Sequence, residues 1–252
     1  MTTQVAARSP ETSVRDRIIV ALDVETVDEA KEIASELSGQ VGAFKIGLQL
    51  FTAAGPTIVR EFTAAGIKVF LDLKFHDIPN TVAKASIEAA RLGVWMFNIH
   101  ASGGSDMMKR TVAEVDNICS VENIERSLII GVTVLTSSND ETLRQVGIAN
   151  NASDQVVSLA KLAESAGLDG VVASPKEVEA VKAAVTAKDF LAVTPGIRSV
   201  SATGDDQKRV TSLRQALSAG SDYVVIGRPI TQAKDRREAV DRIVAESLEA
   251  DR

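Results

Sequence analysis

Apolar residues along the chain follow two patterns, short β-branched runs and longer stretches with helical spacing. The short runs predict eight strands: Arg17–Val24, Phe44–Leu50, Lys68–Phe75, Met96–Ala101, Leu128–Leu135, Gly170–Ser174, Leu191–Ile197 and Tyr223–Arg228. In the longer stretches, apolar residues recur every three or four positions, with charged residues between them. This spacing predicts helices at Val27–Leu37, Pro79–Leu92, Asp154–Ala166, Lys176–Thr186 and Gln207–Ala219.

The alternation of strands with helices predicts the fold class. Consecutive strands joined by helical crossovers are parallel, with right-handed connections. Eight such units within 252 residues indicate an α/β fold, a single-domain (β/α)8 TIM barrel. A doubly wound open sheet is the alternative, although no Gly-x-Gly-x-x-Gly turn follows the first strand. We expect a flexible tail over residues 1–15 and one barrel domain over residues 16–252, because no low-complexity linker interrupts residues 16–250.

Composition and charge narrow the classes of function. A net charge of −6 and a pI near 5.1 argue against binding to nucleic acid or to anionic membranes, which need basic surface. The single cysteine, Cys119, cannot form an intrachain disulfide, and with two histidines it argues against a His/Cys zinc site. Residues 1–15 lack an apolar signal segment, and the run near Leu128–Leu135 is too short to span a bilayer. We expect a cytoplasmic enzyme.

Charged residues lie on the second and third predicted strands, and in TIM barrels catalytic residues come from the carboxyl ends of strands and the loops that follow. Asp72 and Lys74 lie two residues apart and therefore project from one face of their strand. Their apolar neighbours take the opposite face, under the helices: Leu71, Leu73 and Phe75. Lys45 should point inward from the neighbouring strand, and Asp77 follows in the loop. A structural ion pair is the alternative interpretation of an isolated Asp-x-Lys. However, four alternating charges in one cleft are more than such a pair requires.

A second polar group lies at the ends of the seventh and eighth predicted strands. Arg198 follows Gly196 and opens an irregular segment, Ser199–Asp206, which is typical of a lid. Gly227 and Arg228 precede a proline that begins a helix. Glycine N–H groups, an arginine fork and a helix N-terminus all favour phosphate. A tight turn with a solvated arginine is the alternative; two arginines beside a lid favour phosphate.

Other candidates have two interpretations each. Asp23 could bind sugar hydroxyls or cap the next helix, and Thr136 could contact a ligand or cap a helix. His76 and His100 lie near the site, but we assign neither of them a proton-transfer role. Cys119, in a helical stretch away from the strand ends, is expected to be buried.

The segment Phe70-Leu-Asp-Leu-Lys-Phe-His-Asp-Ile-Pro-Asn-Thr81 resembles the Asp-x-Lys-x-x-Asp-Ile-Pro-x-Thr signature of the orotidine 5'-monophosphate decarboxylase family. Further motifs follow in order along nearly the whole chain: Ile19-Val-Ala-Leu-Asp23, Phe44-Lys-Ile-Gly47, Val134-Leu-Thr-Ser137, Thr194-Pro-Gly-Ile-Arg198, Asp206-Gln207 and Val225-Ile-Gly-Arg-Pro229. The resemblance implies a TIM barrel that needs no cofactor and no metal. It would convert orotidine 5'-phosphate into uridine 5'-phosphate in de novo pyrimidine biosynthesis.

The resemblance also implies a role for each matching residue. Four of them would surround the substrate carboxylate, with protonation of C6 by the second lysine: Lys45, Asp72, Lys74 and Asp77. Asp23 and Lys45 would hold the ribose hydroxyls, and Thr136 would contact the pyrimidine. The phosphate and the lid would be held by Arg198, Gln207, Gly227 and Arg228. Family members are homodimers, so three residues would reach the partner's site: Asp77, Ile78 and Thr81.

Two rival functions remain open at this point. Sibling sugar-phosphate decarboxylases and hexulose-phosphate synthases share the Asp-x-Lys-x-x-Asp core but bind Mg2+ through an acidic residue where this chain has Lys45. A lysine at that position would repel the metal. A non-catalytic phosphate-binding barrel would need the phosphate residues but not the charges near Asp72, so the charge array speaks against it.

Overall fold

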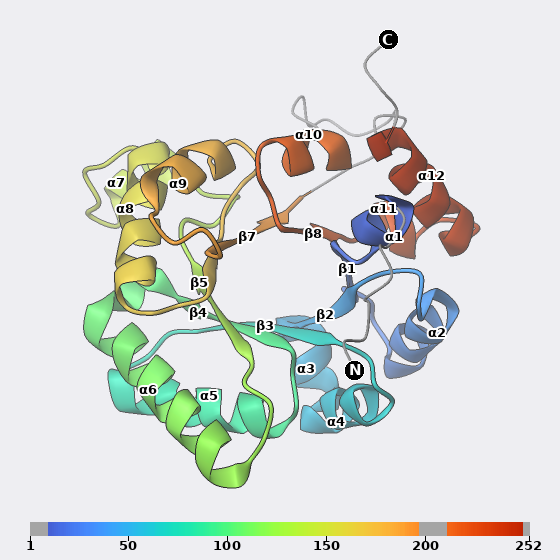
Figure 1. Cartoon of the computed structure of the whole chain (residues 1–252), viewed down its shortest axis with the longest axis horizontal. Helices are drawn as coiled ribbons and strands as arrows, with labels where there is room; N and C mark the ends of the chain where they lie inside the picture. The colour runs from blue at the N-terminus through green and yellow to red at the C-terminus, as the bar shows by residue number, and fades with distance from the viewer. Residues whose placement is uncertain (1–9, 197–210, 249–252) are drawn as a thin grey trace, which may run out of the picture.

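A computed structural model of the chain describes residues 10–196 and 211–248, with side chains from Ser13 onward. Eight parallel strands close into a barrel in sequence order (Figure 1). They are β1 (Ile18–Ala21), β2 (Ala43–Gly47), β3 (Val69–Phe75), β4 (Met96–His100), β5 (Leu128–Val132), β6 (Gly170–Val172), β7 (Leu191–Pro195) and β8 (Tyr223–Ile226). The prediction of a (β/α)8 TIM barrel is confirmed.

Helices surround this ring of strands (Figure 1). In chain order they are α1 (Pro10–Arg15), α2 (Val27–Leu37), α3 (Leu48–Ala54), α4 (Pro56–Ala64), α5 (Pro79–Arg91), α6 (Gly104–Glu122), α7 (Asp140–Gln145), α8 (Ala152–Ser165), α9 (Val178–Ala184), α10 (Leu213–Ser218), α11 (Arg228–Thr231) and α12 (Arg236–Leu248), with a 3-10 turn at Ala101–Gly103.

Several expected boundaries are wrong. The first two strands end at Ala21 and Gly47, each three residues before the expected end, and residues 48–50 belong to α3. Residues 10–15 of the expected tail form α1, and Arg15 at its end pairs with Asp241 of α12. The fifth strand ends at Val132 and not at Leu135. The helix expected from Gln207 begins at Leu213, because Ser212 closes a capping box with Gln215 at that point.

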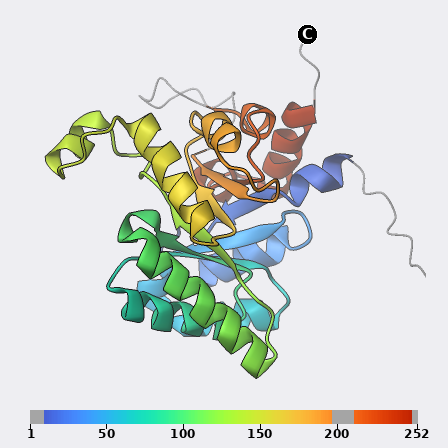
Figure 2. The ribbon, with the colours of Figure 1, turned by 60° about the vertical axis from the view of Figure 1, so that its left-hand side comes forward.

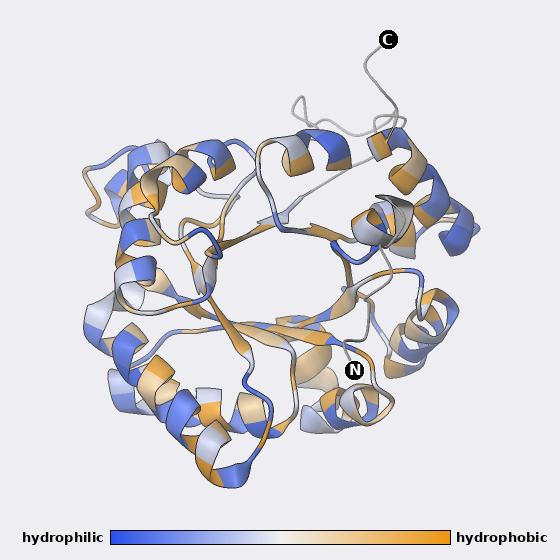
Figure 3. Cartoon of the chain, in the orientation of Figure 1, coloured by the Kyte–Doolittle hydropathy of each residue, from blue (hydrophilic) through white to orange (hydrophobic). Residues whose placement is uncertain are grey.

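Apolar side chains fill two separate layers of the barrel. The larger layer lies between the strands and the helices and includes Ile46, Leu71 and Phe97. The smaller one fills the lumen: Ile19, Ala21, Ala43, Phe70, Met96, Ile130, Val193 and Val225. Figure 3 shows that the strands are largely hydrophobic, while the helices around them carry both hydrophilic and hydrophobic residues. Successive residues of a strand therefore belong to different layers, as the period of two requires.

Because all eight strands are parallel, their carboxyl ends meet at one rim of the barrel. The segment after β5 leaves this rim and leads to α7, which projects away from the body of the molecule (Figure 2). No helix among the described residues is long and apolar enough to cross a membrane.

Candidate active site

Asp72 is the centre of a charged cluster in the lumen. Its Oδ1 accepts hydrogen bonds from Lys74 Nζ at 2.6 Å and from Asn98 Nδ2 at 2.7 Å, while Lys45 Nζ lies 3.3 Å from Oδ2. These residues come from three adjacent strands, and Lys45 and Asn98 are buried. Lys45, Asp72 and Lys74 converge as expected, whereas Asp77, expected in the same cleft, does not line the cavity of its own chain. The amide of Asn98 was not predicted.

Strand alternation places this cluster directly on the apolar filling of the lumen. Lys45 lies two residues beyond Ala43, Asp72 two beyond Phe70, and Asn98 two beyond Met96, all toward the carboxyl ends. Each charged or amide group therefore occupies the next inward-facing position of its strand.

Lys45 links the cluster to the first strand. Its Nζ donates to Asp23 Oδ1 at 2.9 Å, so Asp23, just after β1, joins the array. Gly47 leaves room for this pair, because a Cβ at that position would lie 3.0 Å from Lys45 Nζ and 3.3 Å from Asp23 Oδ1. The Asp23 side chain is 61% exposed and can reach a ligand from its place at the rim.

The backbone of β3 departs from regular strand geometry at Lys74. Its φ of 52° is left-handed, a conformation that costs a non-glycine residue about 1–2 kcal/mol. The pairing of β3 with β4 shifts in register between Leu71 and Phe75, which marks a bulge. The N–H of Lys74 donates to Asn98 Oδ1 at 2.8 Å, so the side chain of Asn98 satisfies it.

Opposing effects act on the pKa of Asp72. Burial would raise the pKa of this carboxyl, but the charges of Lys45 and Lys74 and the hydrogen bonds from Lys74 and Asn98 outweigh it. The pKa of Asp72 therefore lies below its ordinary value, and the residue carries a negative charge at neutral pH. The array consequently holds charges of both signs in a largely buried place.

A cavity of about 170 Å³ opens above the array. Lys45, Asp72, Lys74 and Asn98 form its charged and polar wall, and the remaining lining is largely apolar: Phe70, Val132, Val134, Leu135, Thr136, Val172, Val193, Pro195 and Val225. Thr136 is exposed in the loop after β5 and also borders a wider adjoining hollow of about 740 Å³, beside Arg144 and Lys176. The cavity can enclose a flat ring, with its charges on one side.

The predicted phosphate residues are described only in part. Gly227 follows β8 at the same rim as the array, and the exposed Arg228 begins α11 with a proline in the first turn. Arg198 and Gln207 lie outside the described residues, as does the predicted lid. Gly196 and Thr211, which flank that segment, both border the wider hollow.

Three predicted residues lie at the surface of this chain. Asp77 is exposed, and its Oδ1 accepts the N–H of Ile78 at 2.6 Å. The side chain of Ile78 is 67% exposed, and Thr81 is exposed in the first turn of α5. None of the three lines the cavity of its own chain.

His76 and His100 pack against each other beside the array, with ring centroids 5.2 Å apart. Burial, the neighbouring ring of His76 and the positive charge of Lys74 lower the pKa of His100, and the negative Asp72 opposes this only in part. His100 is therefore neutral at pH 7. Cys119 is buried in α6, as expected.

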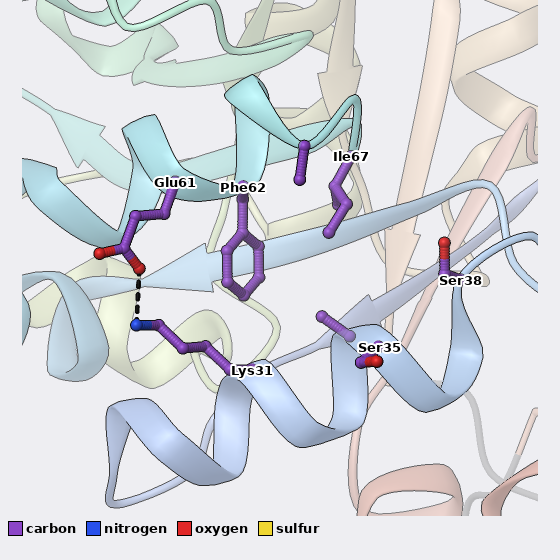
Figure 4. A pocket seen from close by; sticks show the side chains of 8 residues that line it. Lys31, Ser35, Ser38, Glu61, Phe62 and Ile67 are labelled. Atoms are coloured by element: carbon purple, nitrogen blue, oxygen red, sulfur yellow. Dashed lines mark ion pairs between the residues drawn. The ribbon is translucent and has the colours of Figure 1, made fainter.

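A further hollow lies on the flank of the barrel between α2 and α4 (Figure 4). Its two charged residues, Lys31 and Glu61, pair with each other at 2.6 Å across the groove, so they offer no free charge to a ligand. Among residues 10–196 and 211–248, no group of three or more His, Cys, Asp or Glu side chains could hold a metal ion.

Comparison with known proteins agrees with the geometry of the rim. The model of the Orotidine 5'-phosphate decarboxylase / HUMPS family matches residues 16–243. The chain belongs to this family. It is 52% identical over 232 residues to orotidine 5'-phosphate decarboxylase of Geotalea daltonii, covering 92% of this chain and 96% of the relative. The corresponding protein of Geobacter sulfurreducens is 53% identical over 234 residues, with 93% and 97% covered.

A solved structure extends this agreement to three dimensions. Orotidine 5'-phosphate decarboxylase from Lactobacillus acidophilus superposes with a TM-score of 0.80 at 36% sequence identity, covering 92% of this chain and 99% of the other. The resemblance to the orotidine 5'-monophosphate decarboxylase family inferred from motifs is thereby confirmed. The family match begins at residue 16.

Proposed function

We propose that this enzyme of the orotidine 5'-phosphate decarboxylase / HUMPS family converts orotidine 5'-phosphate into uridine 5'-phosphate and CO2, a step of pyrimidine biosynthesis. The observation that carries the proposal is the buried array itself. Lys74 Nζ lies 2.6 Å from Asp72 and both line a small, mainly apolar cavity at the catalytic rim. Membership of the family and the names of the curated relatives support the same substrate.

In the proposed mechanism, the bond between C6 of the pyrimidine and the carboxylate breaks, and its electron pair stays on C6. The ammonium of Lys74 stabilises this carbanion and then donates a proton, so that a C6–H bond forms and Lys74 is left neutral until solvent reprotonates it. A fixed cation in a poorly solvated cavity stabilises developing negative charge far more than water does.

Asp72 has two parts in this mechanism. Its carboxylate holds Lys74 and Lys45 in place through short contacts. Its negative charge also repels the substrate carboxylate, and this repulsion weakens as CO2 leaves. The ground state is therefore destabilised more than the transition state.

Binding of the nucleotide would divide between two groups of residues. Asp23 and Lys45, joined at 2.9 Å, would hold the ribose hydroxyls, and Thr136 at the mouth of the cavity would contact the pyrimidine. Gly227 and Arg228 would hold the phosphate together with Arg198 and Gln207. Phosphate binding, remote from the bond that breaks, would supply the energy for closure over the substrate.

The active unit is proposed to be a homodimer. Asp77, Ile78 and Thr81 are exposed and do not line their own cavity, which supports a role in the partner's site. If the protein sediments as a monomer at concentrations where it turns over substrate, the shared site is wrong.

The test is a turnover assay that follows the loss of orotidine 5'-phosphate absorbance in neutral buffer containing EDTA. Because no cofactor or metal takes part in the proposed reaction, we expect full turnover in EDTA. An absolute requirement for Mg2+ would favour a sugar-phosphate reaction of a sibling enzyme, although the cationic Lys45 disfavours a metal at this place. Binding without turnover would favour a nucleotide sensor.

A further inference from the structure

We infer that Asn98 is a positioning residue for the decarboxylation, which sets the geometry of Asp72 and Lys74 without touching the substrate's reacting bond. The inference rests on the proposed function of that array. Asn98 is 1% exposed on β4, the strand next to the one that carries both charged residues. Its amide is the polar group of the lumen that the sequence motifs did not single out.

Both ends of the Asn98 amide make a hydrogen bond, one as acceptor and the other as donor. Oδ1 accepts the backbone N–H of Lys74 at 2.8 Å, and Nδ2 donates to Asp72 Oδ1 at 2.7 Å. The reverse orientation would set an NH2 against an N–H and an oxygen against a carboxylate, so the chemistry fixes which end is which. A single side chain thus holds the backbone of one catalytic residue and the carboxylate of the other.

The irregular pairing of β3 with β4 explains why the backbone N–H of Lys74 needs a side-chain acceptor. Leu71 pairs with Phe97 and Phe75 with Ile99, so four steps along β3 match two steps along β4, and β3 contains two extra residues. The left-handed backbone of Lys74 falls within this bulge. A backbone N–H released from a ladder must find another acceptor, and Asn98 supplies it.

The two contacts to Asp72 Oδ1 also orient the carboxylate. Lys74 Nζ and Asn98 Nδ2 share Oδ1, which leaves Oδ2 toward Lys45 at 3.3 Å. Without Asn98, the carboxylate can rotate about its terminal bond, and the bulge loses the contact that fixes the start of the Lys74 side chain. The Lys74 ammonium would then spend less time within reach of C6 of the pyrimidine, while the contacts to ribose and phosphate would persist.

The experiment compares two variants at this position with a matched control elsewhere. In Asn98→Ala both hydrogen bonds are lost, and we expect kcat to fall about 10- to 100-fold, with KM changed by no more than about 3-fold. Ser127→Ala is the control: Ser127 is 1% exposed and donates to the Val94 carbonyl at 2.6 Å, near the opposite ends of β4 and β5. It loses a buried hydrogen bond but should keep the wild-type kcat.

Asn98→Asp adds a readout that a purely structural role would not move. The charged groups facing this position are Asp72 and Lys74 on β3 and Lys45 on β2. The titratable His100 lies on the same strand, and the facing part of β5 is apolar. Two buried carboxyls side by side retain one proton, and the introduced carboxyl, while protonated, can donate to Asp72 as the amide did. We expect kcat of this variant to fall as pH rises and the shared proton is lost, a descent absent from the wild type and from Asn98→Ala.

The outcomes separate this inference from the proposed function. If the wild type does not decarboxylate orotidine 5'-phosphate, the proposed function fails. If the wild type does so and folded Asn98→Ala keeps its kcat, the inference about Asn98 is overturned. It is overturned equally if Asn98→Ala and Ser127→Ala lose kcat alike, or if Asn98→Asp has the pH profile of the wild type.

Discussion

The two halves of the barrel lumen are built on the same strands but from opposite kinds of side chain. Toward the amino ends, Phe70 and Met96 pack with other apolar residues. One inward position further along, Asp72 and Asn98 begin the charged layer with Lys45. A shift of two residues along a strand thus separates a region that stabilises the barrel from a region that carries the chemistry.

The physical costs of the two layers differ accordingly. Burying apolar side chains is favourable in itself, at about 25 cal/mol per Å². Burying ions costs several kcal/mol each, and their attraction offsets this only when every group has a partner. The array meets this condition through Asp23, Asp72 and Asn98. We therefore assign the chemistry to the charged array and most of the stability to the apolar layer beneath it.

The largest effect on stability should come from the apolar layer. We expect Met96→Ala to lower the free energy of unfolding by about 2–5 kcal/mol, because it opens a cavity under the array. The kcat of the folded variant should remain within about 2-fold of the wild type, since Met96 does not line the active-site cavity. Urea unfolding and the absorbance assay measure the two quantities. If Met96→Ala lost kcat with its stability unchanged, the division of the lumen into a stabilising and a catalytic layer would be wrong.

A smaller effect on stability should come from His100, which lies beside the charged array and makes the free energy of unfolding depend on pH. The pKa of His100 is lowered in the folded protein, so the unfolded chain binds its proton more readily. Its contribution to stability is complete above the ordinary value of 6.5 and is lost as pH falls through the lower, folded-state pKa. We expect the wild type to lose more stability than His100→Gln between pH 7.5 and pH 5.

Two controls make this pH experiment specific. The lowered pKa of Asp72 acts only below its ordinary value of 3.8, outside the chosen window. The cost of Met96→Ala should be equal at both pH values, since it involves no titrating group. An identical decline in the wild type and in His100→Gln would mean that the pKa of His100 is not lowered in the folded protein.

Alternation along strands predicted the charged layer, because the side-chain period of two depends only on the strand being extended. It correctly separated Asp72 and Lys74 from Leu71. The same parity points Asn98 inward between Phe97 and Ile99 and could have identified it. What alternation could not predict is the bulge at Lys74, since the register of two strands depends on contacts between segments distant in sequence.

The errors at element ends have a similar origin. The residues after Val132 are β-branched or apolar and read as strand, yet the chain leaves the barrel there toward α7. The six residues of α1 carry little local signal, and the helix is fixed by α12 from the other end of the sequence. The placement of Asp77 and Ile78 in a partner's site stays a prediction, because one chain contains only half of such an interface.

The division between the two layers is tested most sharply by the decarboxylation rate of Lys74→Ala in EDTA, measured beside the wild type under saturating orotidine 5'-phosphate. Removing the cation next to Asp72 leaves the carbanion unstabilised and without its proton donor. We predict a loss of kcat of about 10³-fold or more, while the variant stays folded and still binds uridine 5'-phosphate. Near-normal decarboxylation by Lys74→Ala would mean that the charged layer does not carry the chemistry.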